Sequence, residues 1–170
     1  NRELFTQIPE PFTDNYTLGD VNLKYDFGKV NLTSITSYSY RDILVVRDAG
    51  ALTSSITGGS IGKPEEVYTL NAPLNDATHT HVATQELRLS GSTDRLRWLV
   101  GGFFSKVLRD YGQTLLVSGY EAATGTPTEG LRAPKDVLFF SDLAYDLKQS
   151  ALFGEATFSV TDKLNVTAGL

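Results

Sequence analysis

The sequence contains no cysteine and no methionine among its 170 residues, and it has a single tryptophan. The absence of cysteine excludes a disulfide framework, Cys-ligated zinc, iron–sulfur clusters and a thiol nucleophile. No run of about 18 apolar residues is present, so no transmembrane helix is expected. The 15 Lys and Arg are outnumbered by 20 Asp and Glu, for a formal net charge of −5. This balance argues against a nucleic-acid partner, because binding phosphate needs a basic surface.

What the sequence has instead is a period-two alternation of apolar and polar residues, which is typical of strands with two different faces. Three pairs of such runs flank short turns near Gly28, Thr93 and Asp162. Directly opposite residues of an antiparallel pair must share a face, which tests each turn. The pairs that keep apolar side chains together are Phe27 with Val30, Leu89 with Trp98, Leu87 with Val100, Val160 with Leu164 and Phe158 with Val166.

The segments between these hairpins, about 46–81 and about 110–147, are rich in Gly and Pro. They are much longer than the median connection of about 4–6 residues in compact domains. We expect Val107–Val117 and Val137–Leu147 to extend the strands into them. The chain is therefore predicted to be all-β, an antiparallel meander of about six strands in three hairpins. Tight turns at one end and long loops at the other are typical of outer-membrane barrels, whose long loops are extracellular.

The two faces of the predicted strands differ in a way that also favours a large barrel. Glu86, Arg88 and Glu155 fall on the polar face, where a small soluble barrel would need apolar filling, so they are predicted to face a wide lumen. The apolar face would meet lipid, with aromatic residues in two bands near the strand ends. Six strands with a polar interior cannot close such a lumen, so the chain is expected to be one segment of a larger barrel. A chain that begins at Asn1 and holds no Met fits the same expectation.

Five segments of the predicted strands have sequences typical of one known family, namely Thr84–Gly91 (TQELRLSG), Leu96–Phe104 (LRWLVGGFF), Asn31–Asp42, Ser150–Phe158 and Leu164–Leu170. In this order and spacing they resemble barrel strands of TonB-dependent outer-membrane receptors. It implies a barrel of about 22 strands with a plugged lumen, in the bacterial outer membrane. Such receptors import a scarce nutrient, such as an iron–siderophore complex, haem, cobalamin or a saccharide, with energy supplied through TonB.

On this resemblance, residues 1–170 form part of a receptor barrel that lacks the plug domain and is truncated at both ends. The implied partners are outer-membrane lipid, a small nutrient ligand, and the receptor's own plug domain and TonB, both outside this chain. No residue matches a family-wide catalytic or ligand motif, so the resemblance assigns no site and implies no cofactor.

Four residues near strand ends or in loops are candidates for ligand contact, namely Arg47, Arg109, Tyr111 and Tyr120. An arginine can hold a carboxylate with two hydrogen bonds, so an anionic or aromatic ligand would suit them. The simpler interpretation is a solvated rim. His79 and His81 would share one face of a strand and could bind a metal. They are the only two histidines, so a solvated loop end is favoured over a metal site.

Two other classes of function stay open. One is a non-transporting outer-membrane barrel that acts as an adhesin or an enzyme. The other is a soluble all-β ligand-binding module, in which the apolar rows would form a sandwich core. The sequence has no Gly-x-Ser-x-Gly motif and no Ser and His arrangement of a hydrolase, so an enzyme is not expected.

Overall fold

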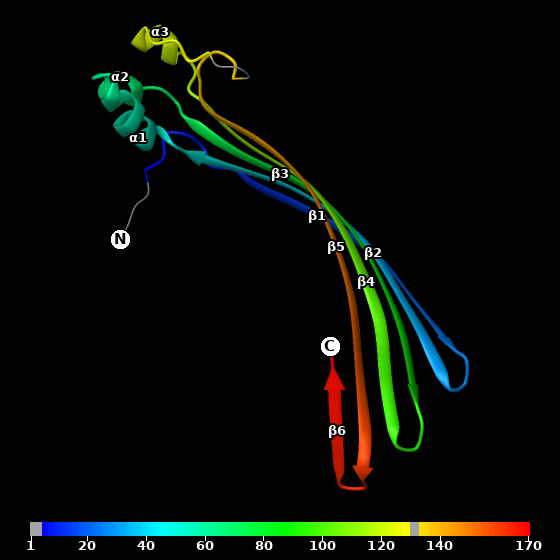
Figure 1. Cartoon of the computed structure of the whole chain (residues 1–170). Coiled ribbons are helices and arrows are strands. Elements are labelled where there is room, and N and C mark those ends of the chain that lie inside the picture. The colour runs from blue at the N-terminus through cyan, green and yellow to red at the C-terminus, as the bar shows by residue number, and fades with distance from the viewer. Residues whose placement is uncertain (1–4, 130–132) are drawn as a thin grey trace. The chain divides into compact units, whose positions relative to one another are not determined.

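The computed structural model describes residues 5–129 and 133–170, and its six strands form one sheet in the order β1-β2-β3-β4-β5-β6 (Figure 1). The strands are β1 (Phe12–Asp26), β2 (Val30–Asp48), β3 (Pro73–Ser92), β4 (Leu96–Leu116), β5 (Val137–Thr161) and β6 (Leu164–Gly169). Each strand therefore pairs with its neighbours in the sequence. The prediction of an all-β antiparallel meander is confirmed.

The three tight turns lie where the alternation predicted them. The amide of Phe27 donates to the carbonyl of Val30 at 2.9 Å, and the amide of Thr93 donates to the carbonyl of Leu96 at 2.8 Å. Gly28 has a φ of 92°, which explains a glycine there, since other residues rarely adopt positive φ. Its amide donates to the carboxylate of Asp26 at 2.6 Å, which fixes the turn further.

The third hairpin corrects one predicted pair. Phe158 lies opposite Val166, as predicted, but Leu164 lies opposite Thr161, because the register shifts between Ser159 and Thr161. The predicted pairing of Val160 with Leu164 is therefore wrong. A bulge of this kind adds one residue to one strand next to the turn, and period-two alternation alone does not reveal it.

The long segments between the hairpins are partly regular. The strand extensions predicted beyond residue 107 and from residue 137 are present in β4 and β5, but residues 73–81 belong to β3 rather than to a loop. The first segment also contains α1 (Gly50–Thr53), a π-helical turn η1 (Ser54–Gly58) and α2 (Pro64–Tyr68), and the second contains α3 (Tyr120–Thr124). Within the described residues, no helix is long and apolar enough to cross a membrane.

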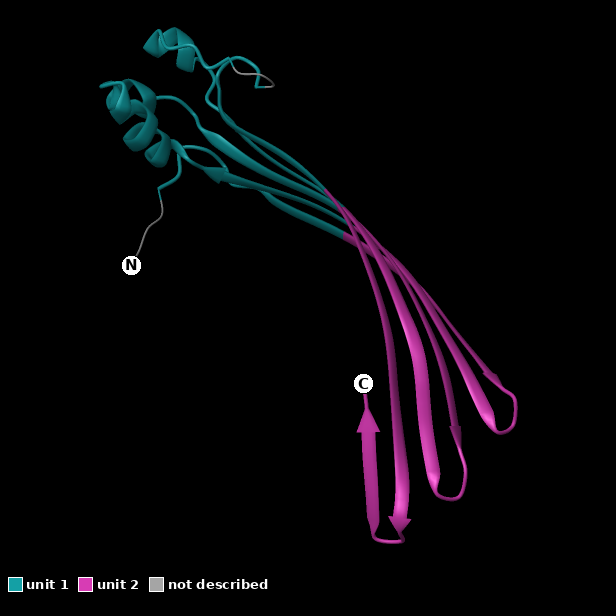
Figure 2. Ribbon diagram, in the orientation of Figure 1, with its two compact units in different colours: residues 1–15, 41–79, 109–144 teal, residues 16–40, 80–108, 145–170 magenta. Residues whose placement is uncertain are grey.

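The chain divides into two compact units (Figure 2). Unit 1 comprises residues 1–15, 41–79 and 109–144, and it holds all the helices. Among its described residues, a small core cluster consists of four buried residues packed against partly buried ones. The buried residues are Val67, Ala72, Val117 and Tyr120, and those against them are Ile61, Leu70, Leu115 and Leu138.

Unit 2 comprises residues 16–40, 80–108 and 145–170, and it holds all three tight turns. Among the described residues, every buried apolar side chain belongs to unit 1. Unit 2 is thus a sheet without a core, and many of its apolar side chains are exposed. They include Val21, Leu23, Tyr25, Phe27, Leu87, Leu89, Val100, Leu152, Phe158, Leu164 and Val166.

The two faces of unit 2 are separated as strand alternation requires. Thr157 and Thr167 lie opposite each other with their hydroxyl oxygens 2.9 Å apart, while Phe158 and Val166 form the next pair and point to the other face. We call the face that bears Phe27, Leu87, Trp98, Leu152 and Phe158 the apolar face. The opposite face, with Arg88, Ser90, Arg97, Glu155 and Thr157, is the polar face.

Candidate ligand-binding site

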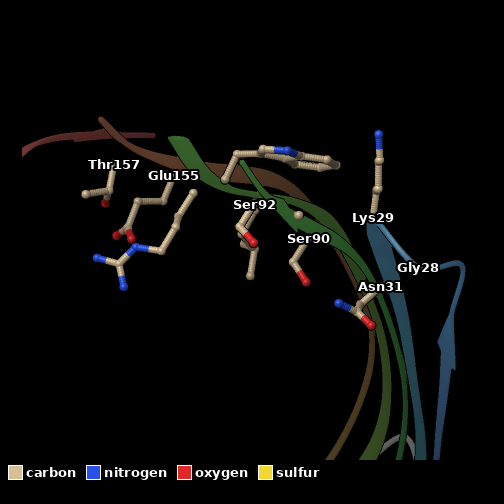
Figure 3. A pocket seen from close by; sticks show the side chains of 11 residues that line it. Gly28, Lys29, Asn31, Ser90, Ser92, Glu155 and Thr157 are labelled. Atoms are coloured by element: carbon tan, nitrogen blue, oxygen red, sulfur yellow. The ribbon is translucent and has the colours of Figure 1, made fainter. Parts of the chain in front are cut away.

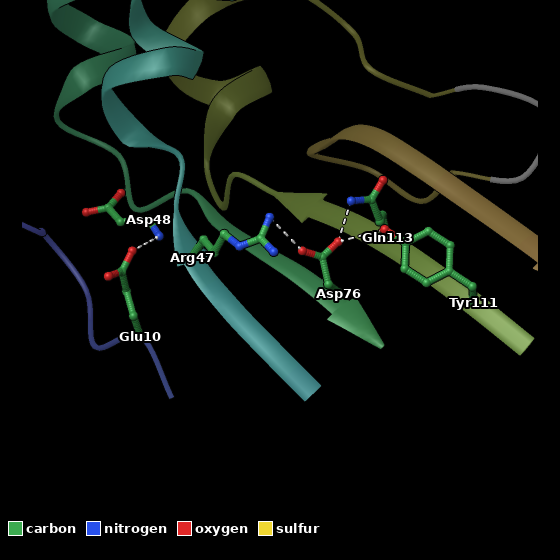
Figure 4. A network of polar contacts seen from close by, with 6 residues as sticks. All are labelled: Glu10, Arg47, Asp48, Asp76, Tyr111 and Gln113. Atoms are coloured by element: carbon green, nitrogen blue, oxygen red, sulfur yellow. Dashed lines mark hydrogen bonds and ion pairs between the residues drawn. The ribbon is translucent and has the colours of Figure 1, made fainter. Parts of the chain in front are cut away.

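A network of polar side chains in unit 1 is centred on Asp76 of β3 (Figure 4). Its Oδ2 lies 3.1 Å from Nη1 of Arg47 on β2. Its Oδ1 accepts hydrogen bonds from the hydroxyl of Tyr111, at 3.2 Å, and from the amide of Gln113, both on β4. Three adjacent strands therefore contribute to one cluster on one face of the sheet.

The acidic residue of this cluster is buried, whereas the basic residue paired with it is exposed to solvent. The side chain of Asp76 is 8% exposed, whereas that of Arg47 is 59% exposed. The guanidinium of Arg109 lies over the ring of Tyr111, with Cζ 5.3 Å from the ring centroid, a geometry in which the cation is attracted to the ring face. Two guanidinium groups and an aromatic ring on one patch can bind an anionic or planar ligand.

Three of the four residues predicted to contact a ligand are thus brought together, namely Arg47, Arg109 and Tyr111. Tyr120 is placed elsewhere, because it is 1% exposed and packs in the apolar core of unit 1. Its position is that of a core residue. The helix α3 that carries it begins after Gly119, whose φ of 87° favours glycine.

Asp76 and Gln113 were missed from the sequence. The sequence predicts a loop around Asp76, and a loop assigns this residue to no face of a sheet. Once β3 is extended to Pro73, alternation places Asp76 on the same face as Glu86 and Arg88. This even-numbered parity was the signal that could have found it.

An apolar cavity of about 290 Å³ adjoins the network. Gln113 lines this cavity and also donates to Asp76, so the apolar space and the charged cluster share a residue. Other lining residues are Leu52, Ile56, Leu74, Leu115 and Phe139. The hydroxyl of Thr53, on the cavity wall, is buried and has no hydrogen-bond partner among the described residues.

The residues predicted to face a lumen lie on the polar face of unit 2. Arg88 donates to the carboxylate of Glu86, two residues away on the same face of β3. Glu155 lines a polar pocket of about 530 Å³. Figure 3 shows Asn31, Ser90, Ser92, Glu155 and Thr157 on one side of the sheet, and Lys29 directed to the other side.

The two histidines each have a partner that is not a metal. Nδ1 of His79 lies 2.9 Å from the carboxylate of Asp42 in unit 1. In unit 2, Nδ1 of His81 lies 2.7 Å from the hydroxyl of Tyr38, and the imidazole lies 4.8 Å from the ring of Tyr40. Within the described part of the chain, no group of three or more His, Cys, Asp or Glu could hold a metal ion.

The loop that follows β4 is held by two carboxylates. Asp136 accepts hydrogen bonds from the amides of Glu121, at 2.8 Å, and Gly119, at 3.0 Å. These bonds lower the pKa of its carboxyl below the ordinary value of 3.8. The hydroxyl and the amide of Thr128 both donate to Glu121, and they lower the pKa of that carboxyl below 4.5. Since each bond favours the charged form, the described residues Gly119, Glu121 and Thr128 are held by two carboxylates in their charged form.

No protein-family model matches the chain, and no curated protein matches its sequence. Among solved structures, the chain is similar to the siderophore receptor PiuA from Acinetobacter baumannii. The two share 14% sequence identity with a TM-score of 0.43, over 94% of this chain and 28% of that receptor. The chain thus spans less than a third of the receptor's length.

Proposed function

We propose that this chain forms part of the wall of an outer-membrane β-barrel receptor, which takes up a small anionic nutrient and is not an enzyme. The observation that carries the proposal is the uncovered apolar face of unit 2. Leu152 is 83% exposed and Phe27 is 64% exposed on a sheet with no second layer. In water such a face would promote aggregation, whereas lipid covers it and no packing partner from the protein is needed.

The dimensions of this face suit a bilayer. Along β2, the apolar face runs from Val30 at the turn to the aromatic pair Tyr38 and Tyr40. About ten residues, at about 3.3 Å each and tilted by about 45°, span roughly 23 Å, close to the roughly 25 Å apolar band of outer-membrane barrels. Phe27, Trp98 and Phe158 lie near the turns. These two groups of aromatic residues supply the two interfacial bands.

The edges of the sheet support a larger assembly. β1 and β6 are the first and last strands of the order, and the sheet does not close by pairing them. A strand edge exposed to hydrocarbon leaves backbone groups without partners, at a cost of several kcal/mol each. We therefore infer that further strands, outside this chain, complete the barrel.

The uptake role is supported by the cluster around Asp76. The exposed guanidinium of Arg47 is held by a buried carboxylate, and Arg109 and Tyr111 lie beside it. We assign this patch to the binding of an anionic nutrient, of which an iron–siderophore complex is one example. The plug domain and TonB belong to the same proposal as partners outside this chain.

The sole tryptophan offers a direct test, with the full chain purified from membranes and reconstituted in vesicles. Trp98 lies on the apolar face. Its indole ring packs against Gly91 of β3, since a Cβ added to that glycine would overlap the ring. We expect phosphatidylcholine brominated on its acyl chains to quench Trp98 fluorescence, most strongly when the bromines are close to the headgroup. Absence of quenching, with the chain remaining in solution, would favour the soluble ligand-binding module.

A matched control moves the probe to the other face. In the variant Trp98→Phe with Thr157→Trp, the only indole lies on the polar face, one strand away. This indole should escape quenching by the brominated lipid. Equal quenching of both proteins would mean that the faces are assigned wrongly.

A further inference from the structure

Two lysines of unit 2 lie directly opposite each other on β4 and β5. The amide of Ser159 donates to the carbonyl of Arg95, and a Cβ on Gly102 would lie 3.4 Å from the side chain of Leu152. The same pairing continues four residues further along β4, where Lys106 is opposite Lys148. Both lysines therefore share the apolar face with Gly102 and Leu152.

Like charges at directly opposite positions destabilise a sheet, and nothing in the described chain compensates for this pair. Neither ammonium lies within 4.0 Å of a described carboxylate. Asp146, the nearest acid along β5 on this face, is two residues from Lys148 and forms no such pair either. The unpaired charges imply an anion that the chain does not itself supply.

Aromatic residues lie on the same face of the neighbouring strands. Tyr38 on β2 shares a hydrogen bond with His81 on β3, and the ring of Tyr40 lies against the same imidazole. Tyrosines of this kind, apolar in the ring and polar at the hydroxyl, favour the headgroup level of a bilayer. They mark the end of the apolar face at which the two lysines also lie.

An apolar groove lies on the same face of β4 and β5 as the lysine pair. It has a volume of about 530 Å³ and is lined mainly by Leu87, Leu89, Val100, Gly102, Leu152 and Gly154. A second hollow of about 460 Å³, which includes Phe104 and Ser150, shares Gly102 and Leu152 with it. The glycines leave this space because they have no side chain. Lys106 lies four positions along β4 from Gly102, which is about 13 Å along a strand.

We propose that this surface binds one molecule of an anionic phosphate-bearing membrane lipid. The phosphate lies between Lys106 and Lys148, and an acyl chain occupies the groove at Gly102 and Gly154. This site rests on the proposed function, since it requires the apolar face to meet a membrane. It is separate from the cluster around Asp76, which belongs to the other unit.

The test measures binding of phosphatidylglycerol and of zwitterionic phosphatidylcholine to the full chain in a neutral detergent, by native mass spectrometry. Lys106→Gln with Lys148→Gln should weaken phosphatidylglycerol binding by about 30-fold, since each basic residue near a membrane surface contributes about fivefold. The control Lys29→Gln with Lys163→Gln removes the same charge from two tight turns and should change binding by less than about twofold. Unchanged phosphatidylglycerol binding in the first variant would overturn the site.

Two further measurements separate the possible failures. Gly102→Leu should weaken both lipids alike, because it fills the groove and leaves the lysines in place. Inorganic phosphate at millimolar concentration should not displace phosphatidylglycerol, and complete displacement would identify a free-anion site instead. If Trp98 is still quenched by brominated lipid while the lysine variant binds normally, the lipid site fails and the proposed function stands. If Trp98 is not quenched by brominated lipid, the proposed function is wrong, and the lipid site that rests on it is wrong as well.

Discussion

Arg47 of β2 and Asp76 of β3 form an ion pair in which the acid is nearly buried and the base is largely exposed, with Nη1 and Oδ2 3.1 Å apart. The asymmetry gives the two residues different roles. Asp76 also accepts from Tyr111 and Gln113, so it organises three strands. Arg47 is held by the pair but faces solvent, where an anionic ligand can reach it.

Substitutions of the two residues of this pair should destabilise unit 1 to different extents. Asp76→Ala leaves the half-buried Tyr111 and Gln113 donors without their acceptor, and should cost about 1–3 kcal/mol. Arg47→Gln removes a largely exposed partner and should cost less than about 1 kcal/mol. Hydrogen exchange of the amides in β3 and β4 of unit 1 measures both. A larger loss of protection in Arg47→Gln than in Asp76→Ala would contradict these roles.

Two neighbouring glycines of β4 should respond oppositely to alanine. A Cβ on Gly101 would overlap the ring of Phe153 on the polar face, whereas one on Gly102 would make an ordinary contact of 3.4 Å with Leu152. We expect Gly101→Ala to destabilise unit 2 by about 1–3 kcal/mol through overpacking. Gly102→Ala should be neutral, or stabilising by up to about 1 kcal/mol. Urea unfolding followed by Trp98 fluorescence compares them, and equal effects would show that Phe153 does not pack on Gly101.

The loop after β4 should lose its order in acid. The pKa values of Glu121 and Asp136 are lowered in the folded chain, so their stabilisation is present above the ordinary values of 4.5 and 3.8. It is lost as the pH falls through the lower folded values. Because the chain has no cysteine, a spin label on Ser118→Cys reports on this loop alone. Its mobility should stay low at pH 7 and rise below about pH 4.

Asp136→Asn is the matched variant for this titration. Asparagine tolerates the positive φ of 65° at this position but cannot ionise. The label should be more mobile in this variant at pH 7, and its remaining pH dependence should come from Glu121. An unchanged titration curve would mean that Asp136 does not hold the loop.

The sequence was sufficient to predict the parts of the fold that alternation controls. The turns at Gly28, Thr93 and Asp162 were predictable because a period of two fixes which face each side chain takes on either side of a short turn. The bulge near Ser159 was not predictable, since one extra residue leaves no trace in apolar content. The helices α1, α2 and α3, of four or five residues, are too short to show a helical period.

The candidate site could be predicted only in part, and for a related reason. Arg109 and Tyr111 are two residues apart on one strand, so their shared face could be inferred. Asp76, which joins them to Arg47, lies in a stretch for which the sequence predicts a loop. The burial of Tyr120 depends on how the loop after Val117 folds back onto Val67 and Ala72, a long-range contact that no local pattern encodes.

An arginine placed on either face of β4 tests the membrane assignment at the level of single residues. Val100 lies on the apolar face near the middle of the predicted band and is 49% exposed. Val100→Arg should destabilise the folded chain in vesicles by about 2–4 kcal/mol, the range for a charge at the bilayer midplane. Its neighbour Leu99 shares the polar pocket with Glu155, so Leu99→Arg places the same charge beside a carboxylate and should cost much less. Folding into vesicles, followed by Trp98 fluorescence, gives both values. If the two variants are equally destabilised, the apolar face of unit 2 does not meet lipid, because only a hydrocarbon environment distinguishes the two positions so strongly.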